Sequence, residues 1–241
     1  MTRPIKNVLI TGAYGGLGQA LAKTYLLAGY NVVLLGRDWE KLTKLTSSLS
    51  AINKPNCTIE GYFCDLNDVA SIMSTVQDIK EDFKKIDILI NCAGIFPIKA
   101  IKDMTIEEYN RCMQVNVAAP FLLIKELSKE MVKNKWGRII NIASSSAYGG
   151  SPNTSIYCAS KHALLGLSRS LYKELKGDGV RVFCVSPGSI QTEMGKEVEK
   201  LGQVYNTFMT PEEVADYILL ATSYDGKMIS EEIRLNRVFV Q

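Results

Sequence analysis

The chain has 241 residues, of which 46% are hydrophobic and 22% charged, the composition of an ordinary globular protein. Its 28 basic and 25 acidic residues are interspersed and give a net charge of +3. Such a balance argues against nucleic acid or an anionic membrane surface as the partner. The length suits one α/β domain, and the sequence contains no run of 18 apolar residues that could cross a membrane.

The six cysteines are scattered, and no two of them have Cys-x-x-Cys spacing. With a single histidine, His162, in the whole chain, a metal site is not expected. Cysteines inside or beside apolar runs are typical of reduced thiols in a reducing compartment. The first residues lead directly into a predicted strand without the apolar stretch of a signal peptide, so we expect a cytoplasmic protein.

Short apolar runs of strand length recur along the chain, and the gaps between them have the spacing of amphipathic helices. Strands are predicted at 7–11, 31–36, 58–63, 86–91, 138–142, 180–186 and, from a weaker pattern, 233–240. Their nearly continuous apolar character is typical of parallel strands buried on both faces. Helices are predicted at 16–28, 39–50, 69–83, 106–133, 155–176 and 211–222.

The alternation of strands and helices predicts right-handed crossovers and a doubly wound, mostly parallel sheet of about seven strands with helices on both faces, an α/β fold of the Rossmann type. We expect a single dinucleotide-binding and catalytic domain over 1–241. The least patterned segment, 188–209, follows the sixth strand. Because loops at the carboxyl ends of such strands form the ligand crevice, this segment is predicted to be a substrate lid.

A glycine-rich loop joins the first strand to the first helix and reads Thr11-Gly12-Ala13-Tyr14-Gly15-Gly16-Leu17-Gly18. Glycines in such a loop let the backbone approach a pyrophosphate and direct a helix N-terminus toward it. The order G-x-G-x-x-G is not met, because Leu21 stands where the third glycine would be. On its own, the loop could therefore also be a tight turn of any α/β protein.

The second predicted strand ends at Gly36 and is followed by Arg37 and Asp38. An acid at this place would bind the ribose hydroxyls of NAD, whereas a guanidinium pairs well with the 2′-phosphate of NADP. We expect Asp38 to cap the helix at 39–50, although it would serve the ribose if the strand ended two residues later. The pattern favours NADP(H), with NAD(H) as the alternative.

Tyr157 and Lys161 are four residues apart and therefore share one face of a helix. A tyrosine with its ordinary pKa of about 10 needs a nearby cation, which stabilises the phenolate, to exchange a proton near neutral pH. Tyr172 and Lys176 have the same spacing but are expected to be a packing residue and a solvated lysine. Tyr157 differs because it stands at a helix start, just after the loop from the fifth strand.

Together these segments resemble the short-chain dehydrogenase/reductase family over nearly the whole chain. Thr11, Gly12, Gly16 and Gly18 meet the T-G-x-x-x-G-x-G pattern of its compact, single-domain members, and the residues from Tyr157 to Lys161 resemble Y-x-A-S-K. The loop also satisfies the T-G-x-x-G-x-x-G pattern of the longer, epimerase-like branch. That branch carries an added substrate domain, for which this chain has no residues left.

The resemblance assigns two further catalytic residues. It implies that Ser144, thirteen residues before Tyr157, hydrogen-bonds the substrate oxygen and favours the charge that builds there. It also implies that Asn116, in Val115-Asn116-Val117, holds a water linking Lys161 to solvent. The implied catalytic set is Asn116, Ser144, Tyr157 and Lys161, with Tyr157 as general acid/base.

The resemblance also implies cofactor contacts after successive strands. Asp65-Leu66 resembles the D-L element near the adenine, Asn91-Cys92-Ala93-Gly94 resembles N-N-A-G with a cysteine in second place, and Pro187 to Thr192 resembles P-G-x-I-x-T near the nicotinamide carboxamide. The predicted cofactor-binding residues are Gly12, Tyr14, Gly16, Leu17, Gly18, Arg37, Asp65, Leu66, Asn91, Ala93, Gly94, Tyr157, Lys161, Pro187, Gly188, Ile190 and Thr192.

The resemblance implies an NADP(H)-dependent oxidoreductase that interconverts a ketone or aldehyde and an alcohol by hydride transfer. Alternatives are an NAD-dependent alcohol dehydrogenase and a 3-oxoacyl thioester reductase of the same family, although the end of this chain, 231–237, lacks the Gly-Gly-containing tail of many such reductases. A non-catalytic cofactor-binding regulator is a remote alternative, since such proteins usually lose the tyrosine or the lysine. A serine hydrolase has no support without G-x-S-x-G.

The substrate is expected to be a small molecule in a mainly apolar pocket, for which the candidate residues are Phe96, Ile98, Tyr148, Met194, Tyr205 and Phe208. His162, next to Lys161, is expected to contact another helix rather than to act in catalysis. The long helices of the family, here 106–133 and 155–176, commonly pair between subunits. The resemblance therefore implies a homodimer or homotetramer.

Overall fold

The computed structural model describes residues 4–199 and 201–238. Parallel strands form one sheet in the order β3-β2-β1-β4-β5-β6-β7. They are β1 (Asn7–Thr11), β2 (Asn31–Gly36), β3 (Ile59–Phe63), β4 (Ile88–Asn91), β5 (Gly137–Ile142), β6 (Val180–Pro187) and β7 (Glu232–Leu235). The order reverses between β1 and β4, and the crevice at the carboxyl ends of these two strands is the place where such sheets bind ligands.

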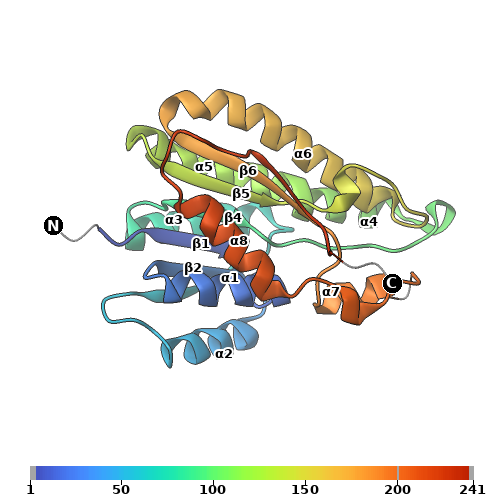
Figure 1. Cartoon of the computed structure of the whole chain (residues 1–241), viewed down its shortest axis with the longest axis horizontal. Helices are drawn as coiled ribbons and strands as arrows, with labels where there is room; N and C mark the ends of the chain where they lie inside the picture. The colour runs from blue at the N-terminus through green and yellow to red at the C-terminus, as the bar shows by residue number, and fades with distance from the viewer. Residues whose placement is uncertain (1–3, 200, 239–241) are drawn as a thin grey trace.

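Helices cover both faces of the sheet (Figure 1). One face is covered by α1 (Gly16–Leu27), α2 (Trp39–Ser50) and α8 (Pro211–Ser223). The other is covered by α3 (Val69–Phe83), α5 (Ala119–Lys133) and α6 (Ser155–Leu175). Each side has its own apolar core, in which side chains of alternate strand positions meet the helices. The doubly wound α/β fold predicted from the sequence is confirmed.

Two strands differ from the prediction. All residues of β1, β4 and β5 are buried, as expected, but β3 lies at the edge of the sheet, and Phe63 at its end is 52% exposed. The expectation of strands buried on both faces is therefore wrong for β3. The last strand ends at Leu235, whereas 233–240 was predicted; residues 236–238 have left the strand, and 239–241 lie outside the described residues.

The predicted helix 106–133 comprises three consecutive segments. These are α4 (Ile106–Met113), a π-helical turn (Gln114–Ala118) and α5. Pro120 lies in the first turn of α5 and has no backbone N–H to donate, which favours a break in the regular hydrogen-bond pattern just before it. Asn116 lies inside the π-helical turn, a wider turn that is frequent at functional sites.

The segment 188–209 is more regular than its sequence predicts, since it contains α7 (Glu193–Glu199) and a 3₁₀ turn (Tyr205–Thr207). Its two ends pair with each other through a bridge between Ile190 and Met209. Within the described part of the chain, no helix combines the length and the apolar character that a membrane crossing requires.

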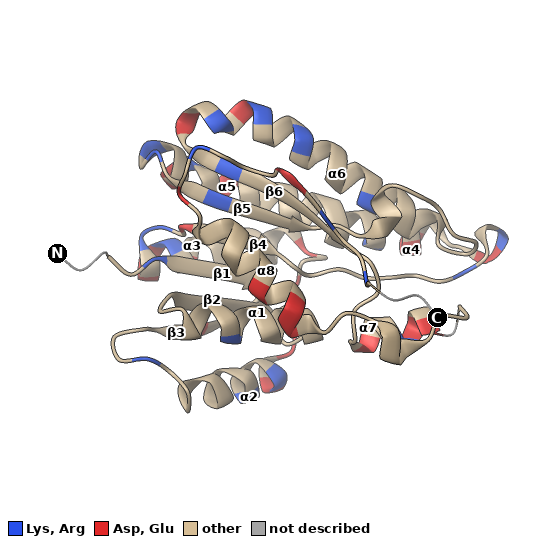
Figure 2. Ribbon diagram, in the orientation of Figure 1, with Lys and Arg blue, Asp and Glu red and all other residues tan. Residues whose placement is uncertain are grey.

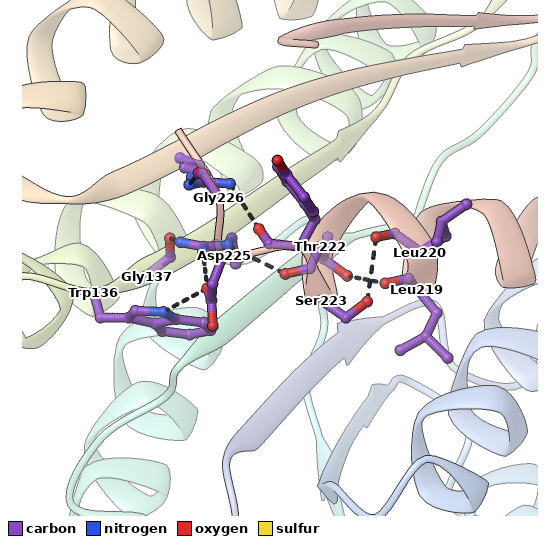
Figure 3. A network of polar contacts seen from close by, with 11 residues as sticks. Trp136, Gly137, Leu219, Leu220, Thr222, Ser223, Asp225 and Gly226 are labelled. Carbon is purple, nitrogen blue, oxygen red and sulfur yellow. Dashed lines mark hydrogen bonds and ion pairs between the residues drawn. The ribbon is translucent and has the colours of Figure 1, made fainter. Parts of the chain in front are cut away.

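A buried arginine connects the amino end of β5 to the chain after α8. It lies at the amino ends of the strands, opposite the ligand crevice at their carboxyl ends. Only 2% of the Arg138 side chain is exposed; it forms an ion pair with Asp225 at 2.5 Å and donates through Nε to the carbonyl oxygen of Thr222 at 3.2 Å. Trp136 donates its indole N–H to the same carboxylate at 3.1 Å (Figure 3). Figure 2 shows basic positions on β5 and β6 at this end of the sheet. The hydrogen bonds of Arg138 compensate for the burial of its charge.

Candidate active site

A cleft of about 730 Å³ opens at the carboxyl edge of the sheet, over the gap between β1 and β4. Its walls come from the loops after β1, β2, β3, β4, β5 and β6 and from the segment 188–209. The cleft is therefore a product of the strand order, because parallel strands bring all these loops to one edge.

The glycine-rich loop forms the floor of the cleft and ends in the N-terminus of α1. Gly12 has φ of +64° and lies so close to the next loop that a Cβ there would be 2.8 Å from Cα of Ala93, so only glycine fits. The N-cap residue of α1, Gly15, provides no side-chain hydrogen bond to the helix. The first amide groups of α1 are thus left for an anionic ligand, as a pyrophosphate requires.

The end of β2 separates the roles of Arg37 and Asp38. The Asp38 carboxylate accepts a hydrogen bond from the backbone N–H of Lys41 at 3.1 Å and pairs with its ammonium at 3.2 Å, so it caps α2 as expected. These bonds lower the pKa of Asp38. Arg37 is exposed at the cleft and has no hydrogen bond or ion pair within the described residues. The ring of Tyr14 lies against Gly36, where a Cβ would collide with its Cε1.

The opposite wall carries Ser144, Tyr157 and Lys161. Ser144 follows the end of β5 in an extended conformation, and its Oγ accepts a hydrogen bond from the N–H of Ser146 at 3.1 Å. Tyr157 and Lys161 lie on successive turns at the start of α6, both buried. The Lys161 ammonium lies 5.6 Å from the centre of the Tyr157 ring and donates to the carbonyl oxygen of Ile142 at 2.8 Å.

Burial sets the protonation of this pair. Desolvation raises the pKa of Tyr157 to about 12, against the opposing effect of a hydrogen bond with Ser144. Desolvation also lowers the pKa of Lys161 to about 8. The phenol therefore holds its proton through the neutral range, as an acid requires, and the lysine is poised to gain or lose its charge just above neutrality.

Asn116 joins the π-helical turn to the loop after β4. Its Oδ1 accepts a hydrogen bond from the N–H of Ile95 at 2.9 Å, and its Nδ2 donates to the carbonyl oxygen of Ile95 at 3.0 Å and to Oγ of Ser160 at 2.9 Å. A Cβ on Gly94 would lie 3.4 Å from Asn116 Oδ1 and 3.6 Å from Lys161 Nζ. Asn116 and Lys161 thus border the same small space beside Gly94.

Most predicted cofactor contacts line this cleft, and one does not. The lining includes Gly12, Tyr14, Gly16, Leu17, Gly18, Arg37, Asp65, Leu66, Ala93, Gly94, Tyr157, Lys161, Pro187, Gly188, Ile190 and Thr192. Asn91 lies below the cleft: its Nδ2 donates to Oδ1 of Asn141 at 2.8 Å, which joins β4 to β5. Its own Oδ1 is buried and has no hydrogen-bond partner among the described residues.

The substrate side is only partly as predicted. Phe96, Met194 and Tyr205 line the cleft, but Ile98, Tyr148 and Phe208 do not. Phe208 packs behind Tyr205, with ring centroids 5.4 Å apart, and Tyr148 turns away to donate to Glu232 at 2.9 Å. His162 is exposed, and its Nδ1 lies 2.8 Å from the carbonyl oxygen of Cys158 in its own helix; the expected contact with another helix stays a prediction.

Several polar lining residues had no signal in the sequence. They are Ser145, Ser146, Ser151, Thr154, Gln191 and Gln203. The serines belong to loops in which a turn role explains the same composition. Gln203 lies in the segment 188–209, where only its place after the sixth strand indicated proximity to a ligand.

Known proteins are similar to this chain in sequence and in fold. The family described as short chain dehydrogenase matches residues 6–201. The 3-oxoacyl-[acyl-carrier-protein] reductase FabG of Rickettsia conorii is 34% identical over 239 residues, covering 96% of this chain and 95% of that protein. D-threitol dehydrogenase of Mycolicibacterium smegmatis is 29% identical over 93% of this chain and 88% of its own length.

Solved structures agree with the fold along the whole chain. A metagenomic short-chain oxidoreductase in complex with NADP has a TM-score of 0.84 at 28% identity and covers 97% of each chain. A variant of actinorhodin polyketide ketoreductase with NADPH has a TM-score of 0.88 at 25% identity, covering 98% of this chain and 96% of that one.

Proposed function

The chain belongs to the short-chain dehydrogenase family of oxidoreductases, and from that premise we propose that it reduces a ketone or aldehyde with NADPH and oxidises the corresponding alcohol with NADP⁺. The observation that carries this proposal is the arrangement of Ser144, Tyr157 and Lys161 on one wall of a cleft whose floor is an uncapped helix N-terminus. The free amide groups at that N-terminus would hold the pyrophosphate of a dinucleotide cofactor.

The residues of the chain supply orientation and the proton. Ser144 donates a hydrogen bond to the carbonyl oxygen and favours the negative charge that develops there. Tyr157 then transfers its phenolic proton to that oxygen, and the Lys161 ammonium stabilises the phenolate left behind. NADPH, when bound, supplies the hydride to the carbonyl carbon. Asn116 completes the proposed catalytic set, holding a water between Lys161 and solvent in the space beside Gly94.

NADP(H) is the proposed cofactor because Arg37 is exposed at the cleft, while Asp38 is engaged in capping α2. A guanidinium can bind a 2′-phosphate through two parallel hydrogen bonds. The residues of the predicted cofactor-binding set that line the cleft form the proposed dinucleotide site. Asn91 enters only indirectly, by holding β4 against β5 below that site.

A 3-oxoacyl thioester is a second candidate substrate, favoured by the FabG relative with 34% identity over 96% of this chain. The apolar lid residues Met194, Val198 and Leu201 line the cleft and would accept an acyl chain. A simple ketone, an aldehyde and such a thioester share the reacting carbonyl, so the catalytic proposal is the same for all three.

We also propose that the chain forms one catalytic domain over 1–241 with 188–209 as its lid, and that it assembles as a homodimer or homotetramer in the cytoplasm. Phe121 of α5 is 47% exposed and lines an open groove with Leu167 of α6, which a second copy would cover. All six cysteines are free, which suits a reducing compartment. Analytical ultracentrifugation of Phe121→Glu, expected to be monomeric, tests the assembly.

A substrate screen that follows NADPH consumption tests the activity. We expect turnover with at least one ketone, aldehyde or 3-oxoacyl thioester, and none with Tyr157→Phe. The variant should bind NADPH as tightly as the wild type, since its phenyl ring keeps the shape of the site. Turnover by Tyr157→Phe would remove the proposed general acid.

A further inference from the structure

The chain after β7 reaches the segment 188–209, and Arg237 forms hydrogen bonds with that segment. Arg237 donates through Nη1 to Oγ1 of Thr207 at 2.6 Å and through Nη2 to Oε1 of Gln203 at 3.2 Å. Its guanidinium also lies over the ring of Phe208, 5.4 Å from the ring centre. Figure 1 shows this end of the chain descending from β7 toward α7.

Two of the three partners of Arg237 connect to the cleft, Gln203 directly and Phe208 through its neighbour. Gln203 is a lining residue, and Phe208 packs against Tyr205, which is another. The neck of the lid is closed without Arg237, by the Ile190–Met209 bridge and by hydrogen bonds from the Gln191 side chain. The tip has less support, because among the described residues the Gln203 side chain has one further hydrogen bond, from Oγ of Ser189 at 2.9 Å.

We propose that Arg237 is a positioning residue that latches the lid in its closed arrangement and fixes Gln203 as a hydrogen-bond donor to the substrate. A guanidinium can only donate, so the amide atom of Gln203 that faces Arg237 is the oxygen. That oxygen accepts from both Arg237 and Ser189, which leaves the Nε2 amide hydrogens as the polar groups that Gln203 can offer to the cleft.

The substrate class follows from this orientation and rests on the proposed carbonyl reduction. A substrate that gains from Gln203 carries a second oxygen acceptor, such as an ester, thioester or hydroxyl oxygen, on the side of its carbonyl that faces the lid. A ketone without that acceptor would leave the Gln203 amide hydrogens unpaired when the lid excludes water. The latch therefore contributes to specificity and leaves the transfer of the proton by Tyr157 unaffected.

Two ketones of equal chain length separate these effects. Ethyl acetoacetate has ester oxygens beyond its ketone, and 2-heptanone has methylene groups in their place. We expect Arg237→Gln and Gln203→Leu each to raise KM for ethyl acetoacetate about tenfold, while KM for 2-heptanone should not rise and should fall where the unpaired amide is removed. The kcat values and the Kd for NADPH should stay within about twofold of wild type. Arg237→Lys, which can donate to one partner at a time, should recover part of the loss.

Arg234→Gln is the matched control, since Arg234 lies within β7, three residues before Arg237, but stacks on Tyr148, 4.2 Å from its ring centre and outside the cleft. It should leave both KM values unchanged. An equal rise for the two ketones in Arg237→Gln, or the same change in Arg234→Gln, would overturn the specificity role. The Gln203→Leu variant tests that role even if Arg237→Gln folds poorly.

Limited proteolysis tests the latch without any substrate. We expect trypsin to cleave the exposed Lys196 bond about tenfold faster in Arg237→Gln than in the wild type or in Arg234→Gln, because the freed lid opens more often. Equal cleavage rates in all three proteins would overturn the latch. If the wild type reduced neither ketone, the proposed function would fail for these substrates, whereas the cleavage rates would still decide the latch.

Discussion

The ring of Phe96 meets the ring of Tyr157 edge to face, with centroids 4.5 Å apart and planes at 65°. Phe96 comes from the loop after β4, and Tyr157 from the first turns of α6. Asn116 fixes that loop through both backbone groups of Ile95, the residue before Phe96. Asn116 thus holds in place the loop that carries the Phe96 ring. That ring contributes to the burial that raises the pKa of Tyr157.

Replacing Phe96 with alanine should lower the pKa of Tyr157. The charged form of a tyrosine is the phenolate, so removing burial favours deprotonation and brings the pKa from about 12 back toward 10. Alcohol oxidation needs the phenolate, and its rising limb in a profile of kcat/KM against pH should therefore move to lower pH by about one unit. Phe96→Leu keeps an apolar cover and should show a smaller shift. A limb that stays in place, or moves upward, would separate Phe96 from the proton transfer.

Replacing Lys161 with methionine should change how stability depends on pH. The folded-state pKa of Lys161 is lowered to about 8, below the ordinary value of 10.5. Between these two values the unfolded chain binds more protons than the folded one, so the wild type gains stability as pH rises through this range. The methionine variant lacks this increase in the free energy of unfolding, which is about 3 kcal/mol at most.

Thermal melts of both proteins from pH 7 to 9.5 measure this effect. The Tm of Lys161→Met relative to the wild type should be highest at pH 7 and should fall steadily as pH rises. The hydrogen bond lost to Ile142 shifts all values alike and does not alter the trend. Tyr157 is common to both proteins and cancels. A constant difference across the range would mean that Lys161 is not destabilised by its burial.

The sequence predicted the interior of the sheet better than its edges. β1, β4 and β5 are central, and each residue in them meets helices or neighbouring strands, so continuous apolar runs reveal them. β3 and β7 have neighbours on one side only, which relaxes the requirement for apolar residues at their ends. That explains why Phe63 is exposed and why the strand predicted to 240 ends at Leu235.

The residues of the site also differ in how well the sequence predicted their places. Tyr157 and Lys161 are four residues apart on one helix, so a local pattern was sufficient to predict their proximity, whereas Ser144 was predicted from the family resemblance. Gln203 meets Arg237 across 34 residues, and that contact depends on how two loops pack. Periodicity carries no information about such a contact. Asn91 was predicted from a motif, but its side chain joins two strands below the cleft, a placement that only strand register determines.

Replacing Arg138 with methionine should destabilise the fold and leave the chemistry intact. The change removes the donors to Asp225 and Thr222 and leaves a carboxylate beside Trp136 without its ion pair. Breaking one partner of a buried pair costs about 3 kcal/mol, here reduced by the 44% exposure of the Asp225 side chain. Urea unfolding should show the lower free energy. Since Arg138 lies at the opposite edge of the sheet, kcat/KM of the folded variant should match the wild type, and a changed KM for NADPH would contradict this separation.

Replacing Arg37 with serine should reverse the cofactor preference, and Asp38→Ser is its matched control. Arg37 is exposed at the cleft with no protein partner among the described residues, so the only binding energy it is placed to supply is that of the 2′-phosphate. Losing that pair should weaken the binding of NADPH by about 2 kcal/mol, which raises its Kd roughly thirtyfold, and should leave the Kd for NADH nearly unchanged.

The control variant Asp38→Ser tests the other residue at the end of β2. Serine at 38 still caps α2, so neither Kd should change more than about twofold if Asp38 is only a cap. Titration of tryptophan fluorescence with each dinucleotide measures all four values. Weaker NADH binding in Asp38→Ser, with NADPH unaffected in Arg37→Ser, would instead assign the ribose to Asp38 and make the protein an NAD-dependent enzyme.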